Sequence, residues 1–423
     1  MNPSSLPVST DRLVARLEAL GRVGALEGGG VCRLALTKAD GEGRDLVVGW
    51  MKELGLDVVV DGIGNLFGTR AGSRPGPSVM IGSHIDTVAT GGLYDGNLGV
   101  LAGLEVIAAL NDAGIVTEHP VTVAAFTNEE GARFQPDMLG SLVHVGGLPL
   151  EEALATKAVD GAVLADELAA IGYAGEASIG GIEAAAYFEY HIEQGPVLEA
   201  EAIEIGVVEG VQGISWTELT LTGRSSHAGT TPMRLRRDAG LAAARIAAEV
   251  AGLAREIGGD VVATVGSVKL TPNLVNVVAA RAVMTVDLRH PDEGILRVVE
   301  ARFAEIVDRV AAEEKVEVAR RTLARFEPVA FAPALVDRVE AVAKRQGRST
   351  RRMFSGAGHD AQMLARVAPA AMIFVPSVGG LSHNVREFTA HADLGNGLSV
   401  LAELVLERAG HANVDAAASR GAV

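Results

Sequence analysis

The feature that most constrains the fold of this chain is a pair of short apolar segments separated by a longer apolar stretch. Val79–Gly82 and Val121–Phe126 have the length and composition of buried strands, and Leu98–Leu110 between them is long enough for a helix. A glycine-rich loop, Gly91–Gly96, connects the first segment to that helix. This order predicts an α/β fold whose mixed, mainly parallel sheet is covered by helices on both faces.

The pattern of apolar residues changes near residue 210 and changes back after Phe331. Between these points the sequence indicates strands near Ser215–Thr222, Val261–Lys269, Ala280–Leu288 and Lys315–Arg320, and helices near Arg237–Ile257 and Glu293–Ala312. After Phe331 a helix, a loop and an apolar strand, Ala370–Val375, resume the earlier pattern. We therefore expect one larger domain that is interrupted by a small inserted α/β sandwich.

The composition argues against several kinds of partner and compartment. The chain of 423 residues carries 53 acidic and 37 basic side chains, and its formal net charge of −16 disfavours nucleic acid and anionic membranes. A single cysteine, Cys32, allows no intramolecular disulfide. The first ten residues lack the basic and apolar segments of a secretion signal. We therefore expect a cytoplasmic protein.

Five short polar segments stand out because most of them follow or adjoin apolar strands. They are Gly82–Asp86, Gly92–Gly96, Thr127–Gly131, His191–Gly195 and Leu381–Asn384. Chemistry in an open α/β sheet collects at the carboxyl ends of the strands, so these segments are candidates for one site. His84 and Asp86 are alternate residues, so the Asp86 carboxylate can accept the far ring N–H of His84 and orient a ligating imidazole.

The imidazoles and carboxylates of these segments match the ligands of divalent metal ions. Asp95 has two oxygens and can bridge two ions, while the adjacent Glu129 and Glu130 point in different directions, so that one can bind metal and the other can hold a water. With His191 and His383 they form a nitrogen and oxygen set that suits zinc, manganese, cobalt or nickel. Structural alternatives stay open, because a lone buried histidine is usually a core residue and adjacent glutamates usually lie on a solvated surface.

These segments, in this order, resemble the metal-dependent amidohydrolases of the M20 peptidase superfamily. Within it the chain looks like the hydantoinase/carbamoylase branch, which contains N-carbamoyl-L-amino-acid hydrolases, β-ureidopropionases and allantoate amidohydrolases. The similarity extends from about Asp40 to Gly397. It also includes Val208–Gly213, Gly223–Met233, Pro272–Val277, Asp287–Arg289 and Ser355–Ala361.

The resemblance implies two divalent ions per subunit, with zinc first and manganese, cobalt or nickel as alternatives. His84, Asp95 and His191 would hold one ion, and Asp95, Glu130 and His383 the other, so that Asp95 is the bridge. Glu129 would be the general base that takes a proton from a water shared by the ions and delivers it to the leaving nitrogen. His191 favours the carbamoylase branch, because many peptidase relatives carry a carboxylate in its place.

By the same resemblance, substrate recognition falls on Gln194, His227, Asn276, Arg289, Gly358 and His359. Arg289 would bind a carboxylate, and His227, which typically comes from the partner subunit in this family, would stabilise the oxyanion. Three structural alternatives stay open. They are a surface pair of Arg289 with Asp287, a turn that His227 braces, and a pair of His359 with Asp360 at a helix start.

The implied function is hydrolysis of the carbamoyl C–N bond of N-carbamoyl-L-amino acids or related ureido acids. The alternatives are an allantoate-type amidohydrolase, another N-acyl amino acid amidase or peptidase of the superfamily, and a non-catalytic binding protein that keeps the fold. The implied domains are a discontinuous catalytic domain, residues 1–213 and 329–423, and an inserted domain, residues 214–328. The inserted domain would act as a lid and would join two chains in a homodimer.

Overall fold

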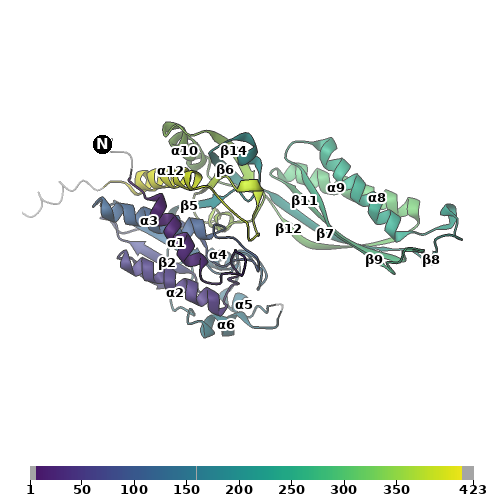
Figure 1. Cartoon of the computed structure of the whole chain (residues 1–423), viewed down its shortest axis with the longest axis horizontal. Helices are drawn as coiled ribbons and strands as arrows, with labels where there is room; N and C mark the ends of the chain where they lie inside the picture. The colour runs from purple at the N-terminus through teal and green to yellow at the C-terminus, as the bar shows by residue number, and fades with distance from the viewer. Residues whose placement is uncertain (1–5, 159, 412–423) are drawn as a thin grey trace, which may run out of the picture. The chain divides into compact units, whose positions relative to one another are not determined.

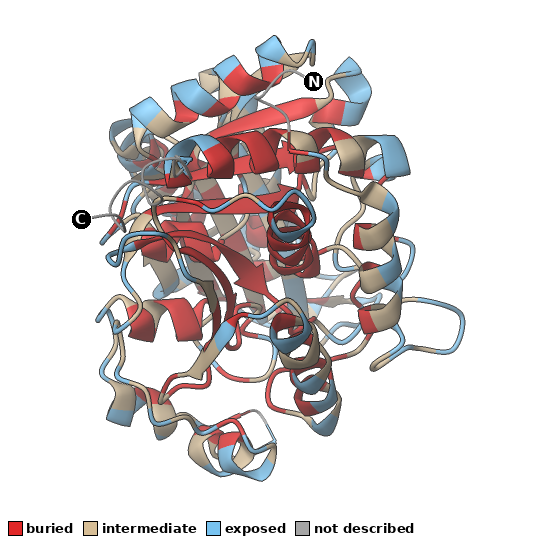
Figure 2. Ribbon diagram, turned by 90° about the vertical axis from the view of Figure 1, so that its left-hand side faces the viewer, coloured by how far each residue is buried: buried red, intermediate tan, exposed pale blue. Residues whose placement is uncertain are grey.

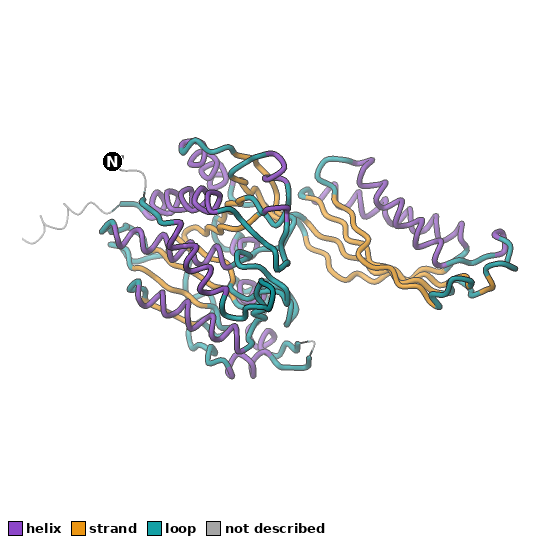
Figure 3. The backbone as a smooth tube through the Cα atoms, viewed as in Figure 1, coloured by secondary structure: helices purple, strands orange, loops and turns teal. Residues whose placement is uncertain are grey.

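The computed structural model describes residues 6–158 and 160–411. Two compact units make up the chain: residues 1–209 together with 330–423 form the larger one, and residues 210–329 form the smaller one. Within the described ranges, no helix is long and apolar enough to cross a membrane. Figures 1 and 3 show the elements of each unit. The roles predicted for the inserted segment, in dimerisation and as a lid, stay predictions.

The larger unit is built on a mixed sheet with the strand order β1-β2-β4-β3-β5-β15-β6-β13, to which β14 adds by pairing with β6. The strands are β1 (Asp57–Val60), β2 (Leu66–Arg70), β3 (Ser78–His84), β4 (Val121–Phe126), β5 (Ala184–Ile192), β6 (Ile205–Val211), β13 (Val329–Ala330), β14 (Thr350–Ser355) and β15 (Ala370–Val375). The central pairs β4–β3, β3–β5 and β5–β15 are parallel, and the β1–β2, β2–β4 and β15–β6 pairs are antiparallel. The predicted fold class is confirmed.

Helices cover this sheet and bury most of its central strands. They are α1 (Thr10–Gly21), α2 (Lys38–Glu53), α3 (Asn97–Asp112), α4 (Leu139–His144), α5 (Leu150–Leu154), α6 (Leu164–Ala170), α7 (Val197–Glu201), α10 (Pro333–Arg345), α11 (Asp360–Leu364) and α12 (His391–Ala409). Every residue of β3, β4 and β15 is buried, as Figure 2 shows for the strands at the centre of this unit. This burial explains why these strands read as continuous apolar runs.

The parallel strands end together, and their ends place the polar segments side by side. His84, the last residue of β3, pairs with Phe126, the last residue of β4. His191, near the end of β5, pairs with Phe374 of β15. The chain segments that follow β3, β4, β5 and β15 therefore begin at one edge of the sheet, as expected for parallel strands.

The smaller unit is a four-stranded antiparallel sheet with two helices on it. Its elements are β7 (Gly213–Thr222), β8 (Ser226–His227), the 3₁₀ turn η1 (Met233–Leu235), α8 (Ala239–Ile257), β9 (Val262–Thr271), β10 (Val277–Val278), β11 (Arg281–His290), α9 (Glu293–Glu314) and β12 (Glu317–Phe326). The sheet order is β12-β7-β11-β9. Alternate residues of β7 and β11, such as Leu219 and Met284, join Ile246 of α8 and Phe303 of α9 in one apolar core. The Asp238 and Asp292 side chains cap the two helices.

Candidate metal centre

His84 lies at the end of β3 with its ring fixed by the backbone. Its Nδ1 is 3.0 Å from the carbonyl oxygen of Asp86, so Nδ1 carries the proton and Nε2 is left to bind a metal. The sequence predicted that the Asp86 carboxylate would make this contact, but that carboxylate lies 3.8 Å from Nδ1. It accepts hydrogen bonds from the backbone N–H groups of Glu129 and Glu130 instead, at 3.2 and 3.3 Å. Asp86 therefore orients the ring through its main chain and holds the Glu129–Glu130 backbone through its side chain.

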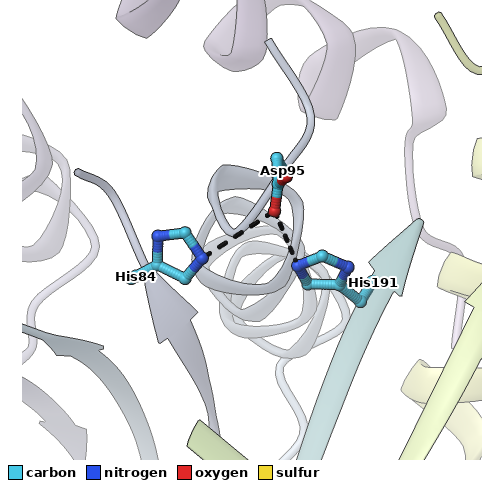
Figure 4. A group of neighbouring side chains, drawn as sticks. All are labelled: His84, Asp95 and His191. Carbon is cyan, nitrogen blue, oxygen red and sulfur yellow. Dashed lines mark ion pairs between the residues drawn. The ribbon is translucent and has the colours of Figure 1, made fainter. Parts of the chain in front are cut away.

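His191, at the end of β5, is oriented in the same way. Its Nδ1 is 2.8 Å from the carbonyl oxygen of Ile192, and its Nε2 faces Oδ1 of Asp95 at 3.2 Å. Nε2 of His84 faces the same oxygen at 3.9 Å. Figure 4 shows the two rings on either side of the Asp95 carboxylate. These three residues form one candidate metal site, since their ligand atoms all lie within 4.8 Å of one another.

A second group uses the other oxygen of the same carboxylate. Nε2 of His383 lies 3.4 Å from Oδ2 of Asp95 and 3.1 Å from Oε2 of Glu130. Ligand atoms of these three residues also lie within 4.8 Å of one another. The structure thus brings together the two groups that the resemblance implied, with Asp95 shared between them.

Contacts from distant parts of the chain hold Asp95 in place. Glu387 accepts the backbone N–H groups of Tyr94 and Asp95, at 2.9 and 3.1 Å. Gln194 Nε2 and Ser382 Oγ both donate to Oδ2 of Asp95, at 2.8 and 2.7 Å. Oδ1 of Asp95 therefore faces His84 and His191. Oδ2 accepts hydrogen bonds from the loops that carry Gln194 and His383.

Glu129 belongs to neither group of ligands and lies beside both. Its Oε2 is 3.3 Å from Nε2 of His84, and the residue is 7% exposed. Burial, together with the negative charges of Asp360 and Glu130, raises the pKa of Glu129 well above its usual range. Because a carboxylate with a raised pKa binds a proton more tightly, Glu129 is suited to accept a proton and retain it.

The donor set fits divalent metal ions. Asp95, Glu129 and Glu130 are crowded acids, and burial also raises the pKa of Glu130. Hydrogen bonds to Asp95 and Glu130 raise the pKa values of His191 and His383 to about 9, against the effect of burial. Because a metal binds the neutral ring, a bound cation would compete with protons for these imidazoles. Imidazole nitrogens and carboxylate oxygens at this spacing are ligands for zinc, manganese, cobalt or nickel.

His359 packs against His191, one of the three residues of the first metal site. Its ring centroid is 4.6 Å from that of His191, and its Nε2 is 2.8 Å from Oγ of Ser355. The structural alternative, a pair with Asp360, is not among its described contacts. Gly358 and His359 line the same cavity as the metal groups.

His227 and Asn276, which the sequence predicted as substrate ligands, lie in the smaller unit and close to each other. His227 of β8 pairs with Val277 of β10, and the Asn276 carbonyl accepts the backbone N–H of Ala228. Nδ1 of His227 accepts the N–H groups of Gly229 and Thr230, at 3.0 and 3.3 Å. The ring therefore does brace a turn, and its neutral form carries the proton on Nε2. The ring is exposed, so Nε2 is available as a donor.

Arg289 lies elsewhere in the same unit. It is part of β11, where it pairs with Ile214, and Arg281 at the other end of β11 pairs with Thr222, just before β8. Along β11 the eight residue steps from Arg281 to Arg289 span about 27 Å. Within a single chain, therefore, Arg289 does not lie near His227. Arg289 donates to both oxygens of Asp287, at 2.8 to 3.1 Å, and its guanidinium lies 5.9 Å from the Trp216 ring centroid. The Arg289–Asp287 pair that the sequence left as an alternative is formed.

Two further residues of this centre were not singled out by sequence reasoning. Glu387, which holds the Asp95 loop, lies in the segment after His383, but no local pattern distinguishes it. Asp137 lines the cavity together with Glu129 and Gly358. The signal that could have found it is its place in the loop that follows the adjacent glutamates.

Comparisons with known proteins show the family to which the chain belongs. The model of peptidase family M20/M25/M40 matches residues 80–407. The chain is 46% identical to an N-carbamoyl-L-amino-acid amidohydrolase of Rhizobium meliloti over 95% of this chain and 97% of that protein. It is 32% identical to an allantoate amidohydrolase of Bacillus subtilis over 93% and 96% of the two chains. A crystal structure of a hydantoinase/carbamoylase family amidase from Burkholderia multivorans superposes with a TM-score of 0.93 at 47% identity, over 96% and 98% of the two chains.

Proposed function

Since the chain belongs to peptidase family M20/M25/M40, and within it to the hydantoinase/carbamoylase branch of amidohydrolases, we propose that it hydrolyses the carbamoyl C–N bond of N-carbamoyl-L-amino acids. The observation that carries the proposal is the pair of imidazole and carboxylate groups that share Asp95 beside the buried Glu129. Identity of 46% to a carbamoyl-amino-acid hydrolase, against 32% to an allantoate hydrolase, favours the carbamoyl substrate.

His84, Asp95 and His191 would hold one divalent ion, and Asp95, Glu130 and His383 the other. Bound there, two such ions acidify a water and polarise the substrate carbonyl. Zinc is the first choice for this ligand set, and manganese, cobalt and nickel are the alternatives. The single cysteine is consistent with a reducing compartment, and we propose the cytoplasm.

Glu129 supplies the proton transfer. Its carboxylate takes a proton from the attacking water, holds it in the buried cavity, and passes it to the nitrogen of the amino acid as the C–N bond breaks. The products are the free amino acid and carbamate, which decays to ammonia and carbon dioxide.

Substrate recognition would fall on residues of both units. Gln194, Gly358 and His359 border the metal groups, and Arg289 would bind the substrate carboxylate. His227 would donate from Nε2 to the developing oxyanion, with Asn276 beside it. Because one smaller unit keeps His227 far from Arg289, we propose that these two residues reach a given site from different subunits of a homodimer. The inserted domain, predicted as residues 214–328, would then serve as the dimerisation and lid domain.

The test of the base is Glu129→Gln, which keeps the size of the side chain and removes its proton chemistry. We expect the variant to bind the same number of metal ions as the parent while kcat falls by roughly two to four orders of magnitude. Metal content is measured by mass spectrometry and turnover by amino acid release. Unchanged turnover would mean that another residue is the base.

The test of the substrate is a panel of N-carbamoyl-L-amino acids, N-carbamoyl-β-alanine, allantoate, N-acyl amino acids and dipeptides, with metal-free protein reloaded by zinc, manganese, cobalt or nickel. The proposal expects the highest kcat/KM on an N-carbamoyl-L-amino acid. Preference for allantoate would favour the allantoate-type alternative, and activity on dipeptides alone would make the protein a peptidase.

A further inference from the structure

A cavity of about 110 Å³ lies at the candidate metal centre of the larger unit. Four of the predicted metal ligands, Glu129, Gln194 and the Ala357–His359 loop form most of its wall. The remaining lining residue, Asp137, has no role in the mechanism described above. It is a carboxylate of the cavity wall that is neither a predicted metal ligand nor the proposed base.

The Asp137 carboxylate has no protein partner other than its own backbone N–H. No hydrogen bond or ion pair joins it to another of the residues 6–158 and 160–411. The other acids of the centre differ in this respect. Asp86 and Glu387 each accept backbone N–H groups, and Asp95 accepts from Gln194 and Ser382. Asp137 is therefore a carboxylate of the cavity with acceptor capacity that no other described residue uses.

The backbone around Asp137 is held firmly against the segment that carries the base. Nδ2 of Asn128 donates to the carbonyls of Phe134 and Pro136, at 2.9 and 3.3 Å, and the N–H of Met138 donates to the carbonyl of Glu129 at 2.7 Å. The loop packs on itself so closely that a Cβ at Gly131 would lie 2.8 Å from Cα of Asp137. The position of Asp137 is thus fixed relative to Glu129.

An ionised carboxylate only accepts hydrogen bonds, so its complement in a bound molecule is an N–H or O–H donor. In an N-carbamoyl amino acid, the carbonyl oxygen would face the metal ions and the bridging nitrogen would receive the proton from Glu129. The terminal NH₂ is the remaining donor of the carbamoyl group, and an N-acyl or N-formyl group lacks it.

We propose that Asp137 accepts a hydrogen bond from the terminal NH₂ of the carbamoyl group, and that this contact makes the site select carbamoyl over acyl substrates. The inference rests on the proposed function and adds to it a residue that recognises the carbamoyl group. A site built to bind an N–H discriminates against analogues without it, because the acceptor in the cavity wall then loses its partner.

The experiment compares an N-carbamoyl-L-amino acid with the N-formyl-L-amino acid of the same side chain, for the parent and for Asp137→Ala and Asp137→Asn. For Asp137→Ala we expect kcat/KM on the carbamoyl substrate to fall about 10- to 100-fold and that on the formyl substrate to change less than about threefold. Asp137→Asn keeps an acceptor oxygen and should lose less. The matched control is Asp57→Asn, which removes an exposed carboxylate on the edge strand β1 and should leave both values unchanged.

A binding measurement separates recognition from turnover. In the Glu129→Gln background, calorimetry should show that Asp137→Ala weakens binding of the carbamoyl compound and leaves binding of the formyl compound unchanged. Equal losses on the two substrates in both Asp137 variants would overturn the inference while leaving the proposed function intact. If Asp137→Ala does not fold, the test uses Asp137→Asn. Its ratio of kcat/KM on the carbamoyl substrate to kcat/KM on the formyl substrate is compared with that of the parent, and an unchanged ratio overturns the inference. A parent enzyme that cleaves neither compound would instead refute the proposed function.

Discussion

Arg33 connects the fold to the metal centre, and its removal should weaken both. The side chain is fully buried and donates to the carbonyl of Ile85 at 2.7 Å, next to His84, and to Oδ1 of Asn97 at 2.7 Å, at the start of α3. It also donates to the carbonyls of Leu20 and Val23, at 3.0 and 2.8 Å. One guanidinium thus joins the end of α1 to the loops on both sides of the site.

The size of the effect follows from these contacts. Arg33→Met keeps the length of the side chain and leaves three buried acceptors and one partly buried acceptor without a donor, at about 1.5 kcal/mol each. Burial lowers the pKa of Arg33 from its ordinary value to about 10. At 1.36 kcal/mol per pKa unit, burying the charge costs roughly 3 kcal/mol of stability. Methionine is uncharged, so the substitution removes this cost. The expected net loss of unfolding free energy is about 3 kcal/mol.

Urea denaturation of the metal-free protein measures this loss, and competition with a chelator measures zinc affinity. We expect zinc affinity to fall roughly 10- to 100-fold, because the groups that orient the ligands lose their support. The matched control is Arg74→Met, an exposed arginine 3.5 Å from Glu118, which should change stability by less than about 0.5 kcal/mol. If Arg33→Met is destabilised but binds zinc with normal affinity, Arg33 does not support the metal centre. If its stability is normal, the hydrogen bonds of Arg33 do not stabilise the fold either.

Three other predictions concern a buried histidine, subunit exchange and Arg289. Burial lowers the pKa of His144 from 6.5 to about 4, so the folded state keeps this ring neutral; unfolding free energy should therefore fall by about 3 kcal/mol as pH drops from 6.5 to 4. His144→Leu should lack that part of the pH dependence in urea denaturation, and parallel curves would contradict it. Mixing His227→Ala with Glu129→Gln chains should restore part of the activity in hybrid dimers, whereas no recovery after verified subunit exchange would place His227 in its own chain's site. Arg289→Lys should raise KM for the substrate more than tenfold with a smaller effect on kcat, and an unchanged KM would leave Arg289 only as the surface partner of Asp287.

The sheet and the places of the metal-binding residues could be predicted because local patterns determine both. Continuous apolar runs such as Val121–Phe126 indicate strands that are buried on both faces, and parallel strands must end at one edge. His84 and His191 lie near the ends of such strands, so their nearness in space follows from the order of the elements. The division of the ligands into two groups was assigned by resemblance, and no strand end indicates His383, which lies in a loop.

The contacts that hold the site were beyond prediction from local pattern. Glu387 lies 292 residues from Asp95 in the sequence, and nothing near it indicates that its carboxylate accepts the Asp95 N–H. The prediction for Asp86 assumed an extended chain, in which alternate side chains share a face. The strand ends at His84, so the chain turns and presents the carbonyl of Asp86 to the ring in place of its carboxylate.

The most direct test of the central claim is a count of the metal ions that the chain binds. Metal-free protein should take up two zinc ions per chain in an equilibrium titration followed by mass spectrometry. His191→Ala and His383→Ala should each keep one high-affinity ion, and Asp95→Ala, which removes the shared carboxylate, should weaken both. A parent chain that binds one ion or none, or a His383→Ala chain that still binds two ions at unchanged affinity, would contradict the two-metal account.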